Sequence, residues 1–224
     1  VGASPGTVEG VTTGQAASPD VLTRINLPHG GIDAYDFNFA EARPASLRGN
    51  VHLSARDGTC FGEQSQQAPL PDVRVLLLDA QGETIQETHT DEEGNYAFNG
   101  LRPGEYTVVE ITPEGLFDGG ARAGTVDGQT VGQADQSRID EITLRSGDRG
   151  VDYEFCEHAP ASLSGTVYHD RDDDGVRDPG EEGIADALLS ILDEVGNLVD
   201  TVQSDEDGRY EFIGLRSGNY RVME

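Results

Sequence analysis

Lysine is absent from this chain of 224 residues, so all 15 of its Lys and Arg side chains are arginine. The 42 Asp and Glu residues give a formal net charge of -27 at pH 7. A surface with this charge repels nucleic acid and anionic membranes, so we expect neither as a partner. High charge also accompanies any well-solvated surface, and by itself it assigns no ligand.

Long apolar runs and recognisable catalytic motifs are absent as well. No stretch approaches the ~20 apolar residues of a membrane-spanning helix, so we expect no membrane insertion in this segment. The chain has neither an initiator Met nor a signal peptide, and we expect it to be part of a longer protein. Its 5 histidines show no paired metal spacing, and no motif places a Ser, His and Asp set. No catalytic residue is predicted, and we expect a protein that is not an enzyme.

An acidic loop of 12 residues, DRDDDGVRDPGE, occupies positions 170–181. Its carboxylates stand at loop positions 1, 3, 5, 9 and 12, with a glycine at 6, which is the pattern of an EF-hand-type calcium loop. Calcium takes about six to eight hard oxygen ligands, and this spacing lets the carboxylates converge on one point. The predicted ligands are five side chains, with the ninth position acting directly or through water, and one backbone carbonyl: Asp170, Asp172, Asp174, Asp178, Glu181 and the carbonyl of Val176. The alternative is a solvated Asp- and Gly-rich turn that holds no metal.

Strands are predicted on both sides of this loop, where an EF-hand would have helices. Upstream, Leu163 and Val167 belong to an alternating pattern, and downstream Tyr210 and Phe212 stand two apart after a turn sequence. A metal would therefore hold an inter-strand loop, which favours a structural ion over a sensor.

The chain repeats itself. RPASLRGNV at 43–51 recurs as APASLSGTV at 159–167, a shift of 159 - 43 = 116. DEEGNYAFNGLRPGEYTVVE at 91–110 returns as DEDGRYEFIGLRSGNYRVME at 205–224, a shift of 205 - 91 = 114. The segment between these two anchors is therefore two residues longer in the first copy.

Three pieces follow from the repeat. AYDFNFAEARPASL at 34–47 matches GVDYEFCEHAPASL at 150–163, so the chain begins within an earlier copy. We predict the C-terminal part of a preceding repeat at 1–44, a complete repeat at 45–160, and the N-terminal part of a following repeat at 161–224.

The complete repeat shows short alternating segments separated by Gly, Pro and Asp turns. Alternation places Tyr106 and Val108 on one face of a strand, and Tyr153 and Phe155 on one face of another. The expected fold class is all-β, as tandem Ig-like or prealbumin-like β-sandwich repeats of about seven strands. The predicted strands are 46–53, 72–79, 83–90, 95–99, 105–111, 138–144 and 150–157.

The chain resembles the SdrD B-like calcium-binding repeats of bacterial surface and secreted proteins, which are related to collagen-adhesin B-type and transthyretin-like β-sandwiches. The resemblance covers essentially the whole chain. It rests on DRDDDGVRDPGEEGI, on TDEEGNYAFNGLRPGEYTVVE with its counterpart SDEDGRYEFIGLRSGNYRVME, and on DYEFCEHAPASL. The middle segment alone also resembles carboxypeptidase-regulatory-like domains. The resemblance implies an extracellular or cell-surface location, calcium as the cofactor, and ligand roles for Asp170, Asp172, Asp174, Asp178 and Glu181.

Two features depart from the family pattern. Many collagen-adhesin relatives cross-link their first and last strands through a lysine side chain, and that bond cannot form in a chain without lysine. In the complete repeat, SARDGTCFGEQSQQAPLP at 54–71 replaces the acidic loop and keeps only Asp57 and Glu63 as carboxylates. We expect no EF-type calcium site in that copy.

Both cysteines lie in the complete repeat, Cys60 in the altered loop and Cys156 in the last predicted strand. The preceding copy has Ala40 at the position of Cys156, and the acidic loop of the next copy has no cysteine. Two exceptions in one repeat suggest a pair, and an extracellular setting would allow a disulfide between them. In sandwiches of this kind the first and last strands commonly run side by side, which would let the two residues meet. The alternative is two reduced, buried thiols.

Two functions remain open. The first is a non-enzymatic structural repeat region of an extracellular bacterial stalk, fibre, surface-layer or adhesin protein, stiffened by calcium and a disulfide. Its partners would be neighbouring repeats of the same protein, with self-assembly into fibres as a further expectation. The second is an adhesive or carbohydrate-binding accessory region of a secreted protein or enzyme, which would gather exposed aromatics on one loop face. Only 6% of the residues are aromatic and most fall in strand patterns, which favours the first function. No host or matrix ligand can be named.

Overall fold

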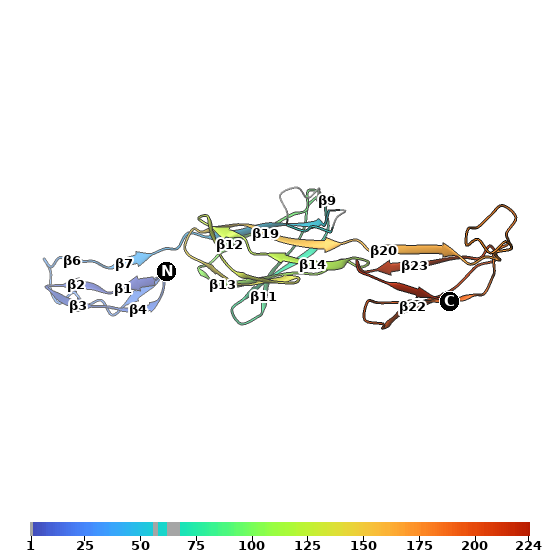
Figure 1. The fold of residues 1–224 in the computed structure, drawn as a ribbon. Helices are drawn as coiled ribbons and strands as arrows, with labels where there is room; N and C mark the ends of the chain where they lie inside the picture. Colours follow the sequence, from blue (N-terminus) through green and yellow to red (C-terminus); the bar gives the residue numbers. More distant parts are fainter. Residues whose placement is uncertain (1, 56–57, 62–67) are drawn as a thin grey trace.

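The computed structural model describes residues 2–55, 58–61 and 68–224, and the regular elements in these ranges are all β-strands. The strands form three groups arranged end to end along an elongated molecule (Figure 1). Within the described ranges no sheet combines strands from two groups. No helix in this part of the chain is long and apolar enough to cross a membrane.

The central group consists of two sheets. The first has the strand order β11-β10-β13-β18-β17, and the second has the order β12-β8-β19-β15-β16, with β14 added beside β19 and β9 beside β8. The strands of the first sheet are β10 (Arg74–Asp79), β11 (Thr84–His89), β13 (Gly104–Glu110), β17 (Gln133–Asp135) and β18 (Arg138–Leu144). Those of the second are β8 (Ala45–Leu53), β9 (Ala68–Pro69), β12 (Asn95–Leu101), β14 (Phe117–Arg122), β15 (Thr125–Val126), β16 (Gln129–Thr130) and β19 (Arg149–His158).

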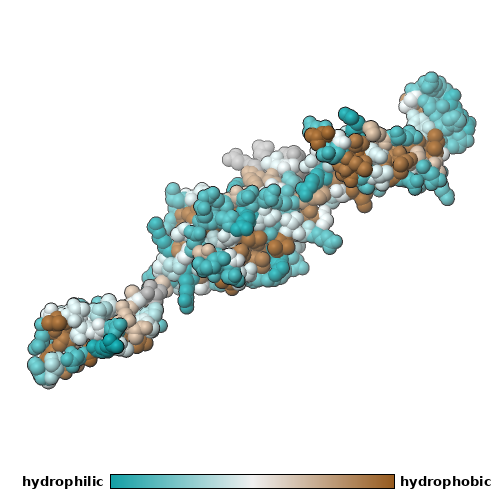
Figure 2. Space-filling model, turned by 90° about the horizontal axis from the view of Figure 1, so that it is seen from below, coloured by the Kyte–Doolittle hydropathy of each residue, from teal (hydrophilic) through white to brown (hydrophobic). Residues whose placement is uncertain are grey.

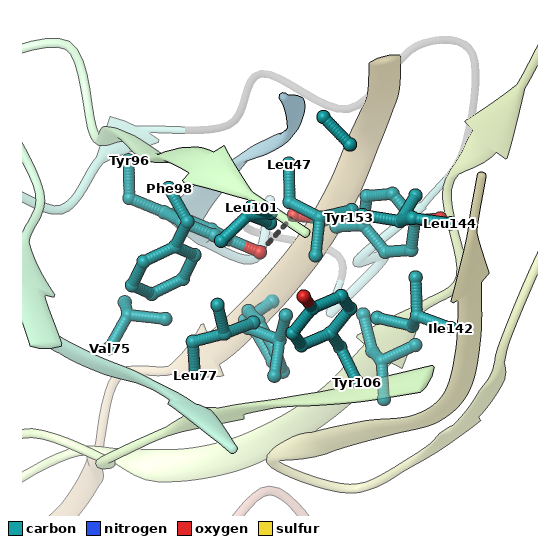
Figure 3. Packing of buried hydrophobic residues seen from close by; sticks show 14 of the residues in the cluster. Leu47, Val75, Leu77, Tyr96, Phe98, Leu101, Tyr106, Ile142, Leu144 and Tyr153 are labelled. Atoms are coloured by element: carbon teal, nitrogen blue, oxygen red, sulfur yellow. Dashed lines mark hydrogen bonds between the residues drawn. The ribbon is translucent and has the colours of Figure 1, made fainter. Parts of the chain in front are cut away.

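Alternating side chains from the two sheets fill a single core between them (Figure 3). Tyr106 and Val108 point into it from β13, and Tyr153 and Phe155 point into it from β19, as their spacing predicts. The Tyr96 hydroxyl donates a hydrogen bond to the carbonyl of Tyr153 at 2.9 Å, so this buried phenol has a polar partner. The expected all-β sandwich is confirmed.

Each of the seven predicted strands has a counterpart whose ends differ by at most two residues. The sequence prediction omitted β9 and the strands β14 to β17. β9, β15, β16 and β17 have only two or three residues, and β14 has the sequence FDGGAR, in which alternation is not visible. The pairing of β14 and β15 with β19, and of β17 with β18, is a tertiary contact that local patterns do not reveal.

The first and last long strands of the sandwich, β8 and β19, run parallel and are hydrogen-bonded to each other. Their register places Phe155 opposite Val51, Cys156 opposite His52 and Glu157 opposite Leu53. This pairing brings the end of β19 beside the start of the loop that follows β8.

Of the outer groups, the last has a small core of its own, made by Leu189, Ile191, Phe212 and Leu215. In the last group, β20 (Ala161–Thr166) pairs with β23 (Arg209–Leu215), and β21 (Leu188–Leu192) lies between β22 (Leu198–Gln203) and β24 (Arg221–Met223). The first group contains β1 (Gly2–Ser4), β2 (Gly6–Val8), β3 (Val11–Thr13), β4 (Gln15–Ser18), β5 (Val21–Thr23), β6 (Ala34–Tyr35) and β7 (Asn38–Ala40). Most exposed large hydrophobic residues of the described chain belong to these two groups. Figure 2 shows hydrophobic patches near both ends of the molecule, among hydrophilic residues.

Candidate functional site

The acidic loop after β20 brings three of its carboxylates together. One side-chain oxygen from each of Asp170, Asp172 and Asp174 lies within 4.8 Å of the other two, and no other group of three potential ligands of this kind occurs among the described residues. Oxygen atoms of ionised carboxylates are the ligands that calcium prefers. The donor set at this point of the loop therefore fits calcium.

Backbone N–H groups hold the first of these carboxylates in place. Asp170 accepts hydrogen bonds from the N–H of Asp173 at 2.8 Å and of Gly175 at 2.9 Å. The Gly175 N–H, with further backbone donors of the loop, lowers the pKa of Asp170. Gly175 adopts a φ of +76°, a left-handed conformation suited to glycine at loop position 6. The turn keeps Asp170 ionised and oriented.

Glu181 closes the loop from its other end. Its side chain is buried, and its two oxygens accept hydrogen bonds from the N–H of Arg171 at 2.8 Å and of Asp178 at 3.0 Å. The carboxylates of Asp178 and Glu181 are not part of the group of three, and the side chain of Val176 is exposed. Of the predicted ligands, Asp170, Asp172 and Asp174 thus lie together, and Glu181 bonds to both ends of the loop. The ligand roles of Asp178, Glu181 and the Val176 carbonyl stay predictions.

Two backbone hydrogen bonds hold the ends of this loop together. The N–H of Val167 donates to the carbonyl of Gly208 at 2.8 Å, and the N–H of Ile184 donates to the carbonyl of Val167 at 2.9 Å. Beyond them, the Ser204 hydroxyl donates to the carbonyl of Ile184 at 2.7 Å. The loop therefore starts and ends against the turn that precedes β23.

The altered loop of the central repeat has the same anchors. The N–H of Val51 donates to the carbonyl of Gly94 at 2.8 Å, and that of Leu70 donates to the carbonyl of Val51 at 3.0 Å. The Thr90 hydroxyl donates to the carbonyl of Leu70 at 2.6 Å. These contacts are the repeat equivalents of those made by Val167, Gly208, Ile184 and Ser204. The span from anchor to anchor is 70 - 51 = 19 positions in this copy and 184 - 167 = 17 in the next, so the two extra residues lie in the loop itself.

A disulfide joins Cys60 of this loop to Cys156 of β19, with a Cα–Cα distance of 5.7 Å. The cysteines of the described chain are therefore paired and not present as reduced thiols. Gly119 of β14 lies against the bond, because a Cβ at that position would come within 2.8 Å of the Cys60 sulfur and 2.9 Å of the Cys156 carbonyl oxygen. Asp57 and Glu63, the two carboxylates noted in the altered loop, lie outside the described residues.

His52 of β8 also contacts this loop. The sequence prediction did not identify it as a functional residue. The ring is buried, with Nε2 3.0 Å from the carbonyl oxygen of Cys60, to which it donates. Burial lowers the pKa of His52, so the ring stays neutral at pH 7. Phe61 packs edge-on against it at 5.8 Å, and the Arg122 guanidinium lies over Phe61 at 5.4 Å. Tyr168 holds the equivalent position of the next repeat. An aromatic ring at the same position of both repeats was the sequence signal that could have identified His52.

Comparison with known proteins identifies similar sequences. The family profile of the SdrD B-like domain matches residues 54–156 and 161–224. Serine-aspartate repeat-containing protein F of Staphylococcus epidermidis is 36% identical over 154 residues, which are 67% of this chain and 9% of that protein. Serine-aspartate repeat-containing protein C of Staphylococcus aureus is 34% identical over 167 residues, which are 72% of this chain and 17% of that protein. The chain therefore spans only a small part of the length of these relatives.

Two solved structures show a weaker likeness. The Bacillus anthracis TIE protein has 19% identity and a TM-score of 0.40, with 93% of this chain and 34% of that chain covered. GBS52, the minor pilin of Streptococcus agalactiae, has 15% identity and a TM-score of 0.36, with 82% of this chain and 83% of that chain covered.

Proposed function

Because this chain belongs to the SdrD B-like domain family, we propose that it is a non-enzymatic structural region of a bacterial stalk, fibre, surface-layer or adhesin protein. Its family and its relatives make it an extracellular, cell-surface repeat segment. The observation that carries the proposal is the loop after the first strand of each repeat. In the central repeat it is tied by a disulfide, and in the next repeat the same loop gathers three carboxylates.

The arrangement of the repeats supports a stiff, extended segment (Figure 1). Only Ala159 and Pro160 separate β19 from β20, and a proline restricts the backbone at this joint. The Arg216 guanidinium of the last group lies over the ring of Phe117 in the central group at 4.3 Å. This cation–π contact crosses the joint and limits bending between neighbouring repeats.

Calcium would stabilise the loop of the following repeat by binding to its folded form alone. Asp170, Asp172 and Asp174 repel one another as anions, and a divalent cation between them removes that repulsion. Extracellular modules of this kind bind calcium with Kd values of ~0.1 to 1 mM. At a calcium concentration ten times the Kd, linkage stabilises the fold by about 1.4 kcal/mol.

The corresponding support in the central repeat is covalent. The disulfide fixes Cys60 to the last strand, and the His52 ring donates a hydrogen bond to the Cys60 carbonyl. We infer that a fixed loop at this position is what each repeat requires, and that an ion and a disulfide are alternative means to it. A rod built this way keeps its shape in calcium-containing surroundings.

Small-angle X-ray scattering of the 224-residue chain tests this function. In calcium we expect one extended particle, and with a chelator a broader distribution of lengths, because only the last repeat loosens. The double variant Asp172→Asn/Asp174→Asn should behave in calcium like the chelated wild type. Glu206→Gln, at an exposed turn of the same repeat, is the matched control and should leave the scattering unchanged. A compact or freely bending particle in saturating calcium would contradict the structural role.

A further inference from the structure

Two glutamates from opposite sheets are buried together in the central sandwich. Glu110 ends β13 and Glu157 lies near the end of β19, with 2% and 0% of their surface exposed. Both oxygens of Glu157 and Oε1 of Glu110 lack a hydrogen-bond donor among the described residues. The other oxygen of Glu110 accepts a hydrogen bond from the Thr112 hydroxyl at 3.4 Å. A buried carboxylate without donors is costly, so this arrangement requires an explanation.

A shared proton provides the missing donor. If one carboxyl group is protonated, its O–H donates to the other carboxylate, and the pair then carries one negative charge in place of two. Burial raises the pKa of Glu110 to about 7. Burial, together with the neighbouring charge of Glu110, raises the pKa of Glu157 to about 9. Both shifts have the direction expected for two acids enclosed together.

Among the residues that the structure describes, no positively charged group acts on the pair. Asp118 of β14 lies opposite Glu157 in the strand register, and its carboxylate disfavours ionisation of both glutamates. The hydroxyl groups of Thr112 and Ser137 contact each other at 3.1 Å on the Glu110 side. The phenol of Tyr96 also interacts with Glu110. Burial raises the pKa of Tyr96 well above 10.

One of the two glutamates recurs in each neighbouring partial copy. Glu157 corresponds to Glu41 (157 - 116 = 41) and Glu110 corresponds to Glu224 (110 + 114 = 224). The residue before Glu157 changes between copies, being Cys156 in one and Ala40 in the other. Each partial copy thus keeps the one glutamate whose position it contains, whereas the disulfide belongs to one copy.

We propose that Glu110 and Glu157 form a proton-binding site that joins the two sheets when it holds a proton and weakens this end of the sandwich when it is fully ionised. Glu157 is two residues before the linker Ala159–Pro160, and Asp118 is next to Phe117, which contacts Arg216 across the joint. The site therefore lies at the end of the central repeat that is joined to the following repeat. Alkaline pH would loosen this end first.

The sign of the pH dependence follows from the direction of the shifts. Folded protein holds more protons than unfolded protein wherever a folded pKa is raised. The stabilisation is complete below the ordinary glutamate pKa and is lost as pH rises through about 7 and about 9. Each proton released changes the unfolding constant by up to about tenfold per pH unit.

The composition leaves this pH range almost free of other titrations. The chain has no lysine, both cysteines are in the disulfide, and burial raises the pKa of Tyr153 to about 12. The ordinary pKa values of histidine, about 6.5, and of tyrosine, about 10, lie outside the range from about pH 7.5 to 9, in which the N-terminal amine is the main other group that ordinarily titrates. A change of stability in this range therefore reports on the glutamate pair.

Guanidinium unfolding of the full chain between pH 6 and 9.5, followed by circular dichroism at constant calcium and ionic strength, tests the proposal. Wild type should lose stability steadily above pH 7. Glu157→Gln supplies an amide N–H donor that needs no proton, so above pH 7 its midpoint should vary less with pH than that of wild type and should exceed that of wild type at pH 9. Glu154→Gln, on the same strand but in a surface ion pair with Arg122, should retain the wild-type pH profile.

A flat wild-type profile above pH 7, or a Glu157→Gln profile as steep as that of wild type, would overturn the proposal. If Glu157→Gln does not fold, carboxyl ¹³C shifts of the wild type decide the question directly. Titration of one of the two glutamates above pH 6.5 supports the shared proton, and titration of both near their ordinary pKa refutes it.

Discussion

Removal of the disulfide is the perturbation whose size can best be derived from the structure. Cys60→Ser combined with Cys156→Ala opens a covalent loop with a sequence separation of 96. In the loop-entropy relation, closing such a loop removes roughly 16 cal/mol/K from the unfolded chain, which stabilises the fold by about 4.7 kcal/mol at 25 °C. For a domain of about 100 residues this corresponds to a melting temperature roughly 20 °C lower in the variant.

The fold of the variant should nevertheless form. β8 and β19 remain paired through backbone hydrogen bonds, and alanine fits the fully buried position of Cys156. The loss should be confined to the central repeat, because the last group has its own core around Phe212 and Ile191. We therefore expect one shifted transition and one unchanged transition.

Thermal and urea unfolding of the oxidised wild type and of the double variant measure the difference. Wild type treated with a reductant is the matched control and should unfold at the midpoint of the variant. A loss below ~1 kcal/mol would refute the reasoning, because it would mean that the altered loop is held without the bond.

Two further predictions concern single contacts. Tyr96→Phe removes the buried hydroxyl that donates to the Tyr153 carbonyl at 2.9 Å. Because the carbonyl is left without this partner, the free energy of unfolding in urea should fall by about 1 to 3 kcal/mol. An unchanged midpoint would show that the bond contributes nothing. Arg216→Ala removes the guanidinium from the ring of Phe117 and should broaden the distance distribution between spin labels on the two repeats, with the melting of the central repeat unchanged. A distribution as narrow as that of wild type would mean that the linker alone sets the joint.

The strands of the sandwich were predictable because alternation of inward and outward residues is a local property. Tyr106 and Val108 are two positions apart and both reach the core. The parallel pairing of β8 with β19 joins residues about a hundred positions apart, and no local pattern encodes it. Strand β14 owes its conformation to its neighbour β19, since its own sequence is rich in glycine.

The candidate site was predictable to the extent that its residues lie in one short segment. Asp170, Asp172 and Asp174 converge because their spacing and a following glycine bend the loop. Glu110 and Glu157 were not predicted as a pair, because they come from different sheets and meet only after folding. The sequence repeats one of them in each neighbouring partial copy, but recurrence alone does not show which residues touch.

Calcium titration of the 224-residue chain by isothermal calorimetry tests most directly whether an ion holds the loop that a disulfide holds in the neighbouring repeat. We predict one calcium ion per chain with a Kd of ~0.1 to 1 mM. Asp174→Asn should abolish this binding, and Glu206→Gln should leave it unchanged. The absence of calcium binding in wild type, or a site that survives Asp174→Asn with unchanged affinity, would contradict the equivalence of the two loops.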